Sequence, residues 1–155
     1  MGSNATVRRL GPADVFPYRA TQAVYADAFD DLESYLSRPP SDAYVARWLG
    51  SAAHVLLVAE IDGEVVAGLT AYVLDKAEQE RAEIYLYDLA VHERHRRRGI
   101  APARIRELPR LGAAVGAGVS FGQADHGDEP AIALYESLGT REEVLHFDVP
   151  VARRP

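Results

Sequence analysis

The sequence predicts a single α/β domain in which a mixed, mostly antiparallel sheet is flanked by helices. The chain has 155 residues, of which 48% are hydrophobic and 26% charged, which is enough for one full core. Near residue 54 the hydrophobic pattern changes from helical spacing to strand-like runs. After residue 91 helical and strand patterns alternate, which is typical of helices packed on the faces of a sheet.

The first forty residues predict one short strand and one long helix. Residues 6–10 favour a strand, and residues 13–29 favour a helix in whose first turn Pro17 is tolerated. Residues 30–40 are polar and end in proline, so we expect a loop there. Ser41 is a suitable N-cap for a second, short helix.

The middle of the chain predicts three consecutive strands. Residues 54–61 and 64–74 are rich in β-branched and aliphatic side chains, and Asp62-Gly63 between them is a strong hairpin signal. Residues 82–91 form a third run of good strand formers. These three strands form the antiparallel part of the expected sheet.

The last third of the chain alternates helices and strands. Residues 100–115 favour a helix that Pro109 and Gly112 should kink or end early. The remaining elements are expected as a strand at 117–124, a helix at 129–139 and a final strand at 142–149. The complete order is β-α-α-β-β-β-α-β-α-β, which implies one sheet with helices on its faces.

Composition excludes several classes of protein. Cysteine is absent, so disulfides, thiolate metal sites and a cysteine nucleophile are excluded. The net charge of -6 argues against nucleic acid as a partner. No run approaches ~18 apolar residues, and no leader is recognisable, so we expect a cytoplasmic protein without a membrane partner. Residues 1–5 resemble a cloning remnant, which leaves a domain at 6–150 and a tail at 151–155.

The stretch HRRRGIAPARIREL at residues 95–108 is unusually basic for this acidic chain. It lies between an expected strand and an expected helix, where backbone N–H groups converge and the helix dipole is positive. Gly99 lets an oxyanion approach the backbone closely, and arginines bind phosphate oxygens through charge-assisted hydrogen bonds. The pattern indicates a diphosphate site that is neither a Walker loop nor a dinucleotide fingerprint. The alternative is a solvated basic turn.

These residues resemble a known family. RRRGIA matches the (Gln/Arg)-x-x-Gly-x-(Gly/Ala) motif of the GNAT superfamily of N-acetyltransferases through Arg96, Gly99 and Ala101. The segments AYVLDKAEQERAEIYLYDLAV, QADHGDEPAIALYESLG and REEVLHFDV resemble more narrowly the aminoglycoside N-acetyltransferases that modify the 3-amino group, the gentamicin-resistance type. The resemblance covers residues 6 to 149 and implies the GNAT acyl-CoA N-acyltransferase fold.

The resemblance implies acetyl-CoA as the cofactor and assigns residues to it. The backbone at Leu89, Ala90 and Val91 is expected to bind the pantetheine arm. Tyr135 is expected to contact the cofactor and to protonate the leaving thiolate as general acid. The diphosphate is expected to lie against Arg96, Arg97, Arg98, Gly99, Ile100 and Ala101. Pro102 removes one N–H from the first turn of that helix, which proline tolerates.

The general base is not settled by the sequence. Direct transfer to an amine needs no nucleophilic residue, but the amine must be neutral when it attacks. Asp88 is the first candidate, because it precedes the Leu-Ala-Val stretch where such a strand bulges. Asp125 is the second and Glu83 the third, the latter from an alternating polar row with Tyr85 and Tyr87. Each carboxylate has the alternative of being simply solvated or hydrogen-bonded.

Acidic side chains are candidates for binding a polycationic substrate such as an aminoglycoside. One cluster precedes the second helix, one follows the 117–124 strand, and one shares a face of the last expected strand. The members are Asp27, Asp30, Asp31 and Glu33; Asp125, Asp128 and Glu129; Glu142, His146 and Asp148; and Glu83 on its own strand. Solvated surface charge is the alternative for each cluster. His92 and His95 lack a third ligand, so we expect no metal site.

Three functions remain open from the sequence. The first is an acetyl-CoA-dependent aminoglycoside 3-N-acetyltransferase that confers gentamicin-type resistance. The second is a GNAT enzyme acting on another cationic amine, such as a polyamine or a peptide amine. The third is an acyl-CoA-binding or interaction module without catalysis. Enzymes of the family that the chain resembles are commonly homodimers, so the resemblance also implies a homodimer.

Overall fold

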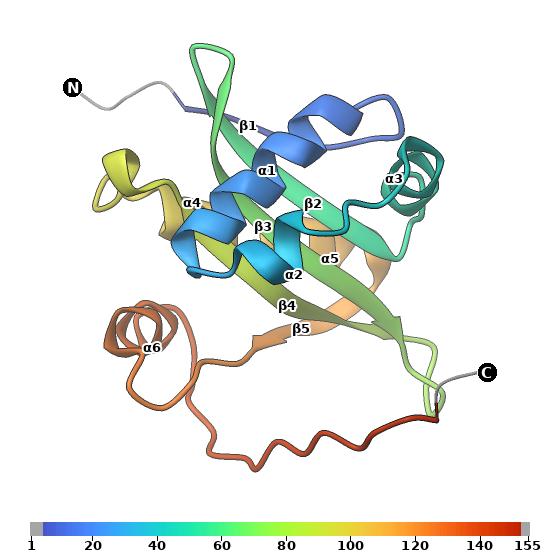
Figure 1. Ribbon diagram of the computed structural model, residues 1–155. Helices are drawn as coiled ribbons and strands as arrows, with labels where there is room; N and C mark the ends of the chain where they lie inside the picture. The colour runs from blue at the N-terminus through green and yellow to red at the C-terminus, as the bar shows by residue number, and fades with distance from the viewer. Residues whose placement is uncertain (1–4, 153–155) are drawn as a thin grey trace. The chain divides into compact units, whose positions relative to one another are not determined.

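The computed structural model describes residues 5–152 and contains a five-stranded sheet (Figure 1). Neighbouring strands follow chain order, the first four antiparallel and the last parallel to the fourth. The mixed, mostly antiparallel sheet predicted from the sequence is therefore confirmed. The strands are β1 (Thr6–Arg9), β2 (His54–Ile61), β3 (Glu64–Asp75), β4 (Ala82–Val91) and β5 (Ala117–Gly122).

The chain divides into two compact units, one ending at Gln123 and one beginning at Ala124. The first unit contains the whole sheet, and the second contains helix α6 (Glu129–Glu136) and the segment after it. The predicted division into a domain at 6–150 and terminal extensions stays a prediction, and residues 1–4 and 153–155 lie outside the described residues. Over the part of the chain that the structure describes, no helix is both long and apolar enough to cross a membrane.

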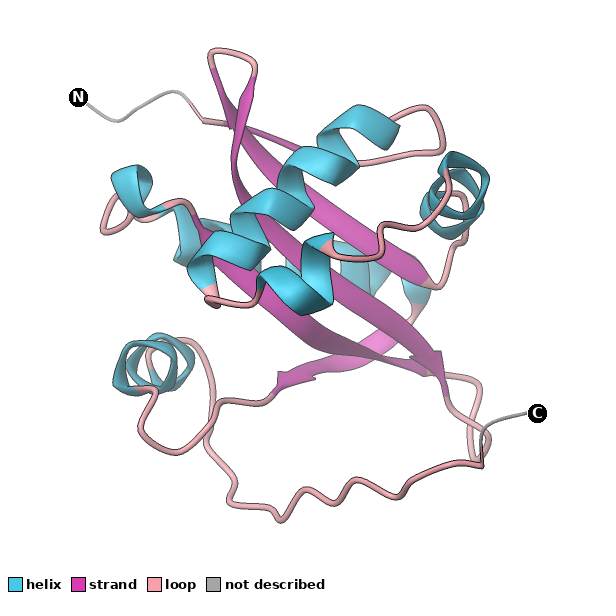
Figure 2. Ribbon diagram, viewed as in Figure 1, coloured by secondary structure: helices cyan, strands magenta, loops and turns pink. Residues whose placement is uncertain are grey.

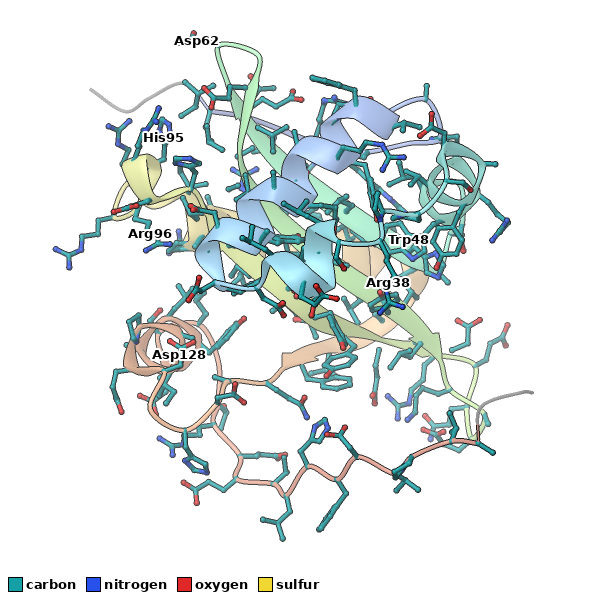
Figure 3. The ribbon with its side chains drawn as sticks, viewed as in Figure 1. Arg38, Trp48, Asp62, His95, Arg96 and Asp128 are labelled. Atoms are coloured by element: carbon teal, nitrogen blue, oxygen red, sulfur yellow. The ribbon has the colours of Figure 1, made fainter. Side chains whose placement is uncertain are left out.

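The hairpin between β2 and β3 forms as the sequence predicts. Asp62 and Gly63 make the turn with φ angles of 51° and 81°. A two-residue hairpin turn of this kind requires positive φ at both positions, which aspartate tolerates and glycine adopts freely. Figure 3 shows Asp62 at the tip of this hairpin.

Helices cover both faces of the sheet. Helix α1 (Val15–Ala28) lies across one face in Figure 1 and approaches β3 so closely that a Cβ on Gly68 would overlap Thr21 and Tyr25. Helix α5 (Leu108–Val115) covers the opposite face, where Gly112 lies over Ile84. The α1 side of the sheet carries the buried ring of Tyr25, whose hydroxyl lies 2.9 Å from the Thr70 hydroxyl.

The 30–40 segment differs from the loop predicted for it, because it contains the short helix α2 (Leu32–Leu36). Asp31 starts this turn by accepting a hydrogen bond from the Ser34 amide at 2.9 Å. Tyr35 then packs its ring against Tyr25 of α1 at 5.7 Å. One helical turn is too short to show periodicity, so packing rather than pattern stabilises it.

The second predicted helix is present as α3 (Asp42–Leu49). Ser41 caps it by accepting a hydrogen bond from the Tyr44 amide at 3.2 Å, as the sequence predicts. The predicted 100–115 helix is divided into α4 (Ile100–Ile105) and α5. Pro109 then occupies the first turn of a new helix, where its missing N–H costs nothing, instead of a helix interior.

The predicted final strand at 142–149 is wrong. The segment after α6 has no regular secondary structure as far as residue 152 (Figure 2). Alternating side chains favour an extended backbone, but a strand forms only when its N–H and C=O groups find a neighbouring strand. Within the described residues of the second unit there is no other strand. Strand β5 and helix α6 also end earlier than predicted, at Gly122 and Glu136.

Candidate active site

Asp88 lies beside a bulge in β4. Thr70 of β3 pairs with Asp88 and Ala71 with Leu86, so Tyr87 is an extra residue on β4. The bulge occurs where the sequence places it and turns Asp88 toward the α1 side of the sheet. There the Tyr35 hydroxyl donates a hydrogen bond to Asp88 Oδ1 at 2.8 Å.

The environment of Asp88 suits a proton acceptor. Burial raises the pKa of its carboxyl, and the hydrogen bond from Tyr35 opposes this rise in part. Burial and the neighbouring carboxylate also raise the pKa of the Tyr35 hydroxyl, which therefore remains a donor. No cation pairs with Asp88 within residues 5–152. A half-buried carboxylate with a raised pKa and no counter-ion is typical of catalytic bases.

Glu83, the third candidate base, has different partners. Arg81 approaches its carboxylate at 2.9 Å and Lys76 at 3.8 Å. Two cations therefore lie beside the Glu83 carboxylate, in contrast to Asp88. This geometry favours Asp88 over Glu83 as the base.

Within the described residues, strand pairing covers only one edge of β4 beyond Asp88. Pairing with β5 ends at Leu86 opposite Gly122, while pairing with β3 continues through Val91. Residues 89–91 consequently have a strand partner on one side only among the described residues. Their other edge can form hydrogen bonds with an extended, amide-bearing chain, which is the role that the family resemblance assigns to Leu89, Ala90 and Val91.

The arginine loop follows β4 directly. A single 3-10 turn (Glu93–His95) leads to Arg96, whose Nε donates to the Val91 carbonyl at 3.2 Å. Arg97 and Gly99 both have positive φ, 61° and 73°. Helix α4 then begins at Ile100, and the first N–H groups of a helix have no intrahelical acceptor.

This loop fits the diphosphate of an acyl-CoA. A Cβ built on Gly99 meets nothing within 4 Å, so its backbone is open to a ligand. All three arginines from Arg96 to Arg98 are exposed, and Figure 3 shows Arg96 and His95 projecting from the loop. Helix α4 has only 6 residues, so its dipole is short. Backbone donors and guanidinium groups are therefore the main features that suit an anion here.

The acidic cluster around α2 is only partly available to a ligand. Asp31 already accepts the hydrogen bond from Ser34 that begins the helix, which lowers the pKa of its carboxyl. Asp30, with a φ of 51°, and Glu33 are exposed. Because α2 also carries Tyr35, the same short helix positions these carboxylates and the hydrogen-bond donor of Asp88.

The second unit carries the remaining candidates. Asp128 caps α6 by accepting from the Ala131 amide at 3.2 Å, and Glu129 and Tyr135 lie on that helix. His146 and Asp148 make a side-chain contact of 3.0 Å, as expected for residues two apart on an extended chain. The predicted roles of Asp125, Glu129, Tyr135 and Glu142 stay predictions, as does the placement of the His146 pair near substrate.

Sequence reasoning missed Tyr35 as a partner of Asp88. The two residues are far apart in the chain and meet only because α2 forms over the bulge, for which the polar 30–40 segment gave no periodic signal. Within residues 5–152, no group of three or more histidine, aspartate or glutamate side chains is placed to hold a metal ion.

Comparison with known proteins identifies the family. Residues 21–140 match the model of the acetyltransferase (GNAT) family. A solved aminoglycoside acetyltransferase from an uncultured soil metagenomic sample is 52% identical, with a TM-score of 0.93 over 96% of this chain and 99% of that chain. A second aminoglycoside acetyltransferase of soil metagenomic origin, solved with sisomicin, is 25% identical, with a TM-score of 0.87 over 96% and 97% of the two chains.

Other comparisons are less informative about function. A ribosomal-protein-alanine N-acetyltransferase from Brucella melitensis biovar Abortus 2308 shares the fold at 22% identity, with a TM-score of 0.74 over 96% and 99% of the two chains. The search of curated proteins found no match. The family match covers most of the chain. The protein belongs to the GNAT family of acetyltransferases and is an acyltransferase.

Proposed function

We propose that this protein transfers an acetyl group from acetyl-CoA to an amino group of an aminoglycoside. The observation that carries the proposal is the arrangement on β4, where the half-buried carboxylate of Asp88 directly precedes an open strand edge at residues 89–91. A base and a binding edge for the acyl donor are thereby held on one rigid element. The arginine loop continues from that edge and suits the diphosphate of the same donor.

The residues have separate tasks in this proposal. Asp88 accepts the proton that the substrate ammonium loses, directly or through water, and the neutral amine then attacks the acetyl carbonyl. The attack forms the C–N bond and an oxyanion that a backbone N–H of residues 89–91 stabilises. When this oxyanion collapses, the C–S bond breaks and Tyr135 gives its proton to the leaving thiolate. The nitrogen of the new amide releases its excess proton to solvent, from which Tyr135 is reprotonated. Acetyl-CoA supplies the activated acetyl group.

Aminoglycosides are the acceptor class that the comparisons support. The relative at 52% identity is an aminoglycoside acetyltransferase, and the more distant relative has been solved with sisomicin and also with trehalose. The acidic character of this chain, with a net charge of -6, suits a polycationic acceptor. Acetylation of the 3-amino group, gentamicin-type resistance and a homodimer are finer parts of the proposal, supported by the sequence resemblance. A cytoplasmic location is a further part, for which the composition of the sequence speaks.

Thiol release from acetyl-CoA tests the proposal directly. Purified protein is offered gentamicin and spermidine in separate reactions, with the acceptor-free rate subtracted. We expect release with gentamicin and background rates with spermidine. Release with spermidine alone would retain the acetyl transfer and replace the aminoglycoside by a polyamine. The position of the acetyl group on the product, read by NMR, then tests the 3-amino assignment.

A further inference from the structure

Aromatic side chains form a row straight across four strands of the sheet. His54 of β2 pairs with Tyr72 of β3, Tyr72 pairs with Tyr85 of β4, and Tyr85 pairs with Phe121 of β5. Cross-strand partners lie on the same face of a sheet, so these four rings are neighbours on one face. Tyr87, the extra residue of the bulge, joins the row. We call these residues, together with Trp48 of α3, the aromatic row.

Ring contacts make the row continuous. At one end Trp48 stacks on His54 with centroids 4.7 Å apart, and Figure 3 shows Trp48 on α3. At the other end Tyr85 and Phe121 stack at 5.0 Å with an interplanar angle of 11°. Tyr87 contacts the rings of both Tyr72 and Tyr85, at 5.7 and 5.6 Å. Stacked and edge-to-face pairs of this kind hold the rings in fixed positions.

Trp48 packs against the hydrophobic core, but the exposed rings on β4 and β5 lie outside it. Ile84 and Leu86 point to the opposite face of β4 and are buried there, beneath the α5 side. On the row's own face an open groove of about 390 Å³ is lined mainly by its rings. Tyr87 is 61% exposed and Phe121 41%. Ordered aromatic surface that remains in contact with solvent is typical of a binding site.

Electrostatics define what the groove can accept. Burial raises the pKa of the Tyr72 and Tyr85 hydroxyls, and the negative charge of Asp88, which follows Tyr87 immediately, adds to the rise. The Tyr85 hydroxyl donates to Gln123 at 2.9 Å, so polar groups also border the rings. Aromatic faces attract cations, and the nearby carboxylate adds to this attraction. An anionic partner such as a nucleic acid is disfavoured by the same charge.

We propose that the aromatic row is the acceptor platform of the enzyme, on which the rings of an aminoglycoside lie with an amino group directed to Asp88. The inference rests on the proposed function and adds residues that determine its specificity. Amino-sugar rings offer C–H faces to aromatic rings and ammonium groups to their π-electrons. A linear polyamine lacks such ring faces. The row therefore favours ring-bearing polycations over linear ones.

Trp48 provides a direct readout, because it is the only tryptophan in the chain and lies at one end of the row. Its fluorescence is followed while gentamicin is added to the protein. We expect a saturable change. Phe121→Leu and Tyr87→Leu replace exposed rings by aliphatic side chains at a distance from Trp48 along the row. Each is expected to weaken gentamicin binding by about tenfold, while the KM for acetyl-CoA and the kcat at saturating gentamicin stay close to wild type.

Phe16→Leu is the matched control, because Phe16 is 83% exposed on α1 and lies outside the row. It should leave gentamicin binding unchanged. Unchanged binding in the Phe121→Leu/Tyr87→Leu double variant, with wild-type acetylation of gentamicin, would overturn the platform and leave the proposed function intact. If that variant instead changed its oligomeric state and still bound gentamicin, the platform would be overturned, and the aromatic row would be a contact surface between two copies of the protein. Wild-type protein that neither binds nor acetylates gentamicin would overturn both proposals.

Discussion

At the scale of single residues, the decisive feature is the pair formed by Asp88 and Tyr35. Burial raises the pKa of the Asp88 carboxyl, and the hydrogen bond from Tyr35 limits the rise. A base acts only when deprotonated, so kcat/KM should increase as pH rises through the pKa of Asp88. Tyr35 is then a positioning residue that adjusts this pKa without touching the reacting atoms.

We expect Asp88→Asn to lower kcat/KM by about 10²–10⁴-fold and to abolish the rising part of the pH profile that Asp88 causes. Stability provides the control. Because the pKa of Asp88 is raised in the folded state, the carboxyl stabilises the fold at low pH, where it is protonated. This stabilisation is lost as pH rises through the raised pKa. The variant should therefore unfold at a temperature equal to or above that of the wild type at neutral pH. A wild-type pH profile in the variant would exclude Asp88 as the base.

Tyr35→Phe removes the hydrogen bond that favours the charged carboxylate, so the pKa of Asp88 should rise further. The increase of kcat/KM with pH should accordingly shift to higher pH, with little loss of activity above it. Tyr44→Phe, an exposed tyrosine on α3, is the matched control and should leave the profile in place. Superimposable profiles for Tyr35→Phe and wild type would show that the contact does not tune the base.

Tyr135→Phe tests the general acid. Without the hydroxyl the thiolate must leave unprotonated, so kcat should fall by on the order of 10²-fold. The affinity for coenzyme A, measured by calorimetry with the protein alone, should stay close to wild type. Unchanged turnover would remove Tyr135 from the chemistry.

At the scale of elements, α1 and the arginine loop depend on backbone positions that only glycine suits. Gly68 lets α1 approach β3, since a Cβ there would overlap Thr21 and the Tyr25 ring. Gly99 begins α4 with a positive φ and leaves its backbone open. Gly68 therefore matters for the packing of α1, and Gly99 for the approach of a ligand. Substituting each glycine separately distinguishes a loss of stability from a loss of ligand binding.

Gly68→Ala should destabilise the fold by about 1–3 kcal/mol, because the added methyl group overpacks the α1 face. Chemical denaturation measures the loss. Thr21→Ser removes the methyl group nearest to the new Cβ while keeping the hydroxyl that bonds to the Pro17 carbonyl. The double variant should lose less stability than the sum of the single variants. Additive losses would mean that overlap with Thr21 does not cause the destabilisation by Gly68→Ala.

Gly99→Ala should raise the KM for acetyl-CoA, because it strains a left-handed position in the loop that suits the diphosphate. Gly116→Ala is a close match, since Gly116 has a φ of 69°, against 73° for Gly99, and an equally open surrounding. Both variants should lose about 1–2 kcal/mol of stability from the strain. Only Gly99→Ala should change the KM for acetyl-CoA. Equal KM values in the two variants would argue against a diphosphate at this loop.

At the scale of the whole molecule, the sequence predicts features made by residues close together in the chain better than contacts between distant segments. The hairpin at Asp62-Gly63 and the cap at Ser41 are local, and both were predicted correctly. The β2–β3–β4 strands follow from long hydrophobic runs. The RRRGIA motif and the Asp88 bulge follow from resemblance to a family rather than from periodicity.

Interactions between distant segments were not predictable in the same way. The contact of Tyr35 with Asp88 requires a one-turn helix that forms only by packing. The aromatic row requires the register of four strands, which the bulge at Tyr87 shifts by one residue. The prediction of a strand at 142–149 was wrong, because alternating side chains indicate an extended backbone only. They do not show whether a neighbouring strand is present to pair with it.

The most direct test of the whole account is a competition between acceptors. The protein receives acetyl-CoA with equal amounts of gentamicin, spermidine and a peptide with a free amino terminus, and mass spectrometry identifies the products. The account predicts that gentamicin gains one acetyl group while the other two amines remain unmodified. Acetylated spermidine or peptide, with gentamicin unchanged, would contradict it.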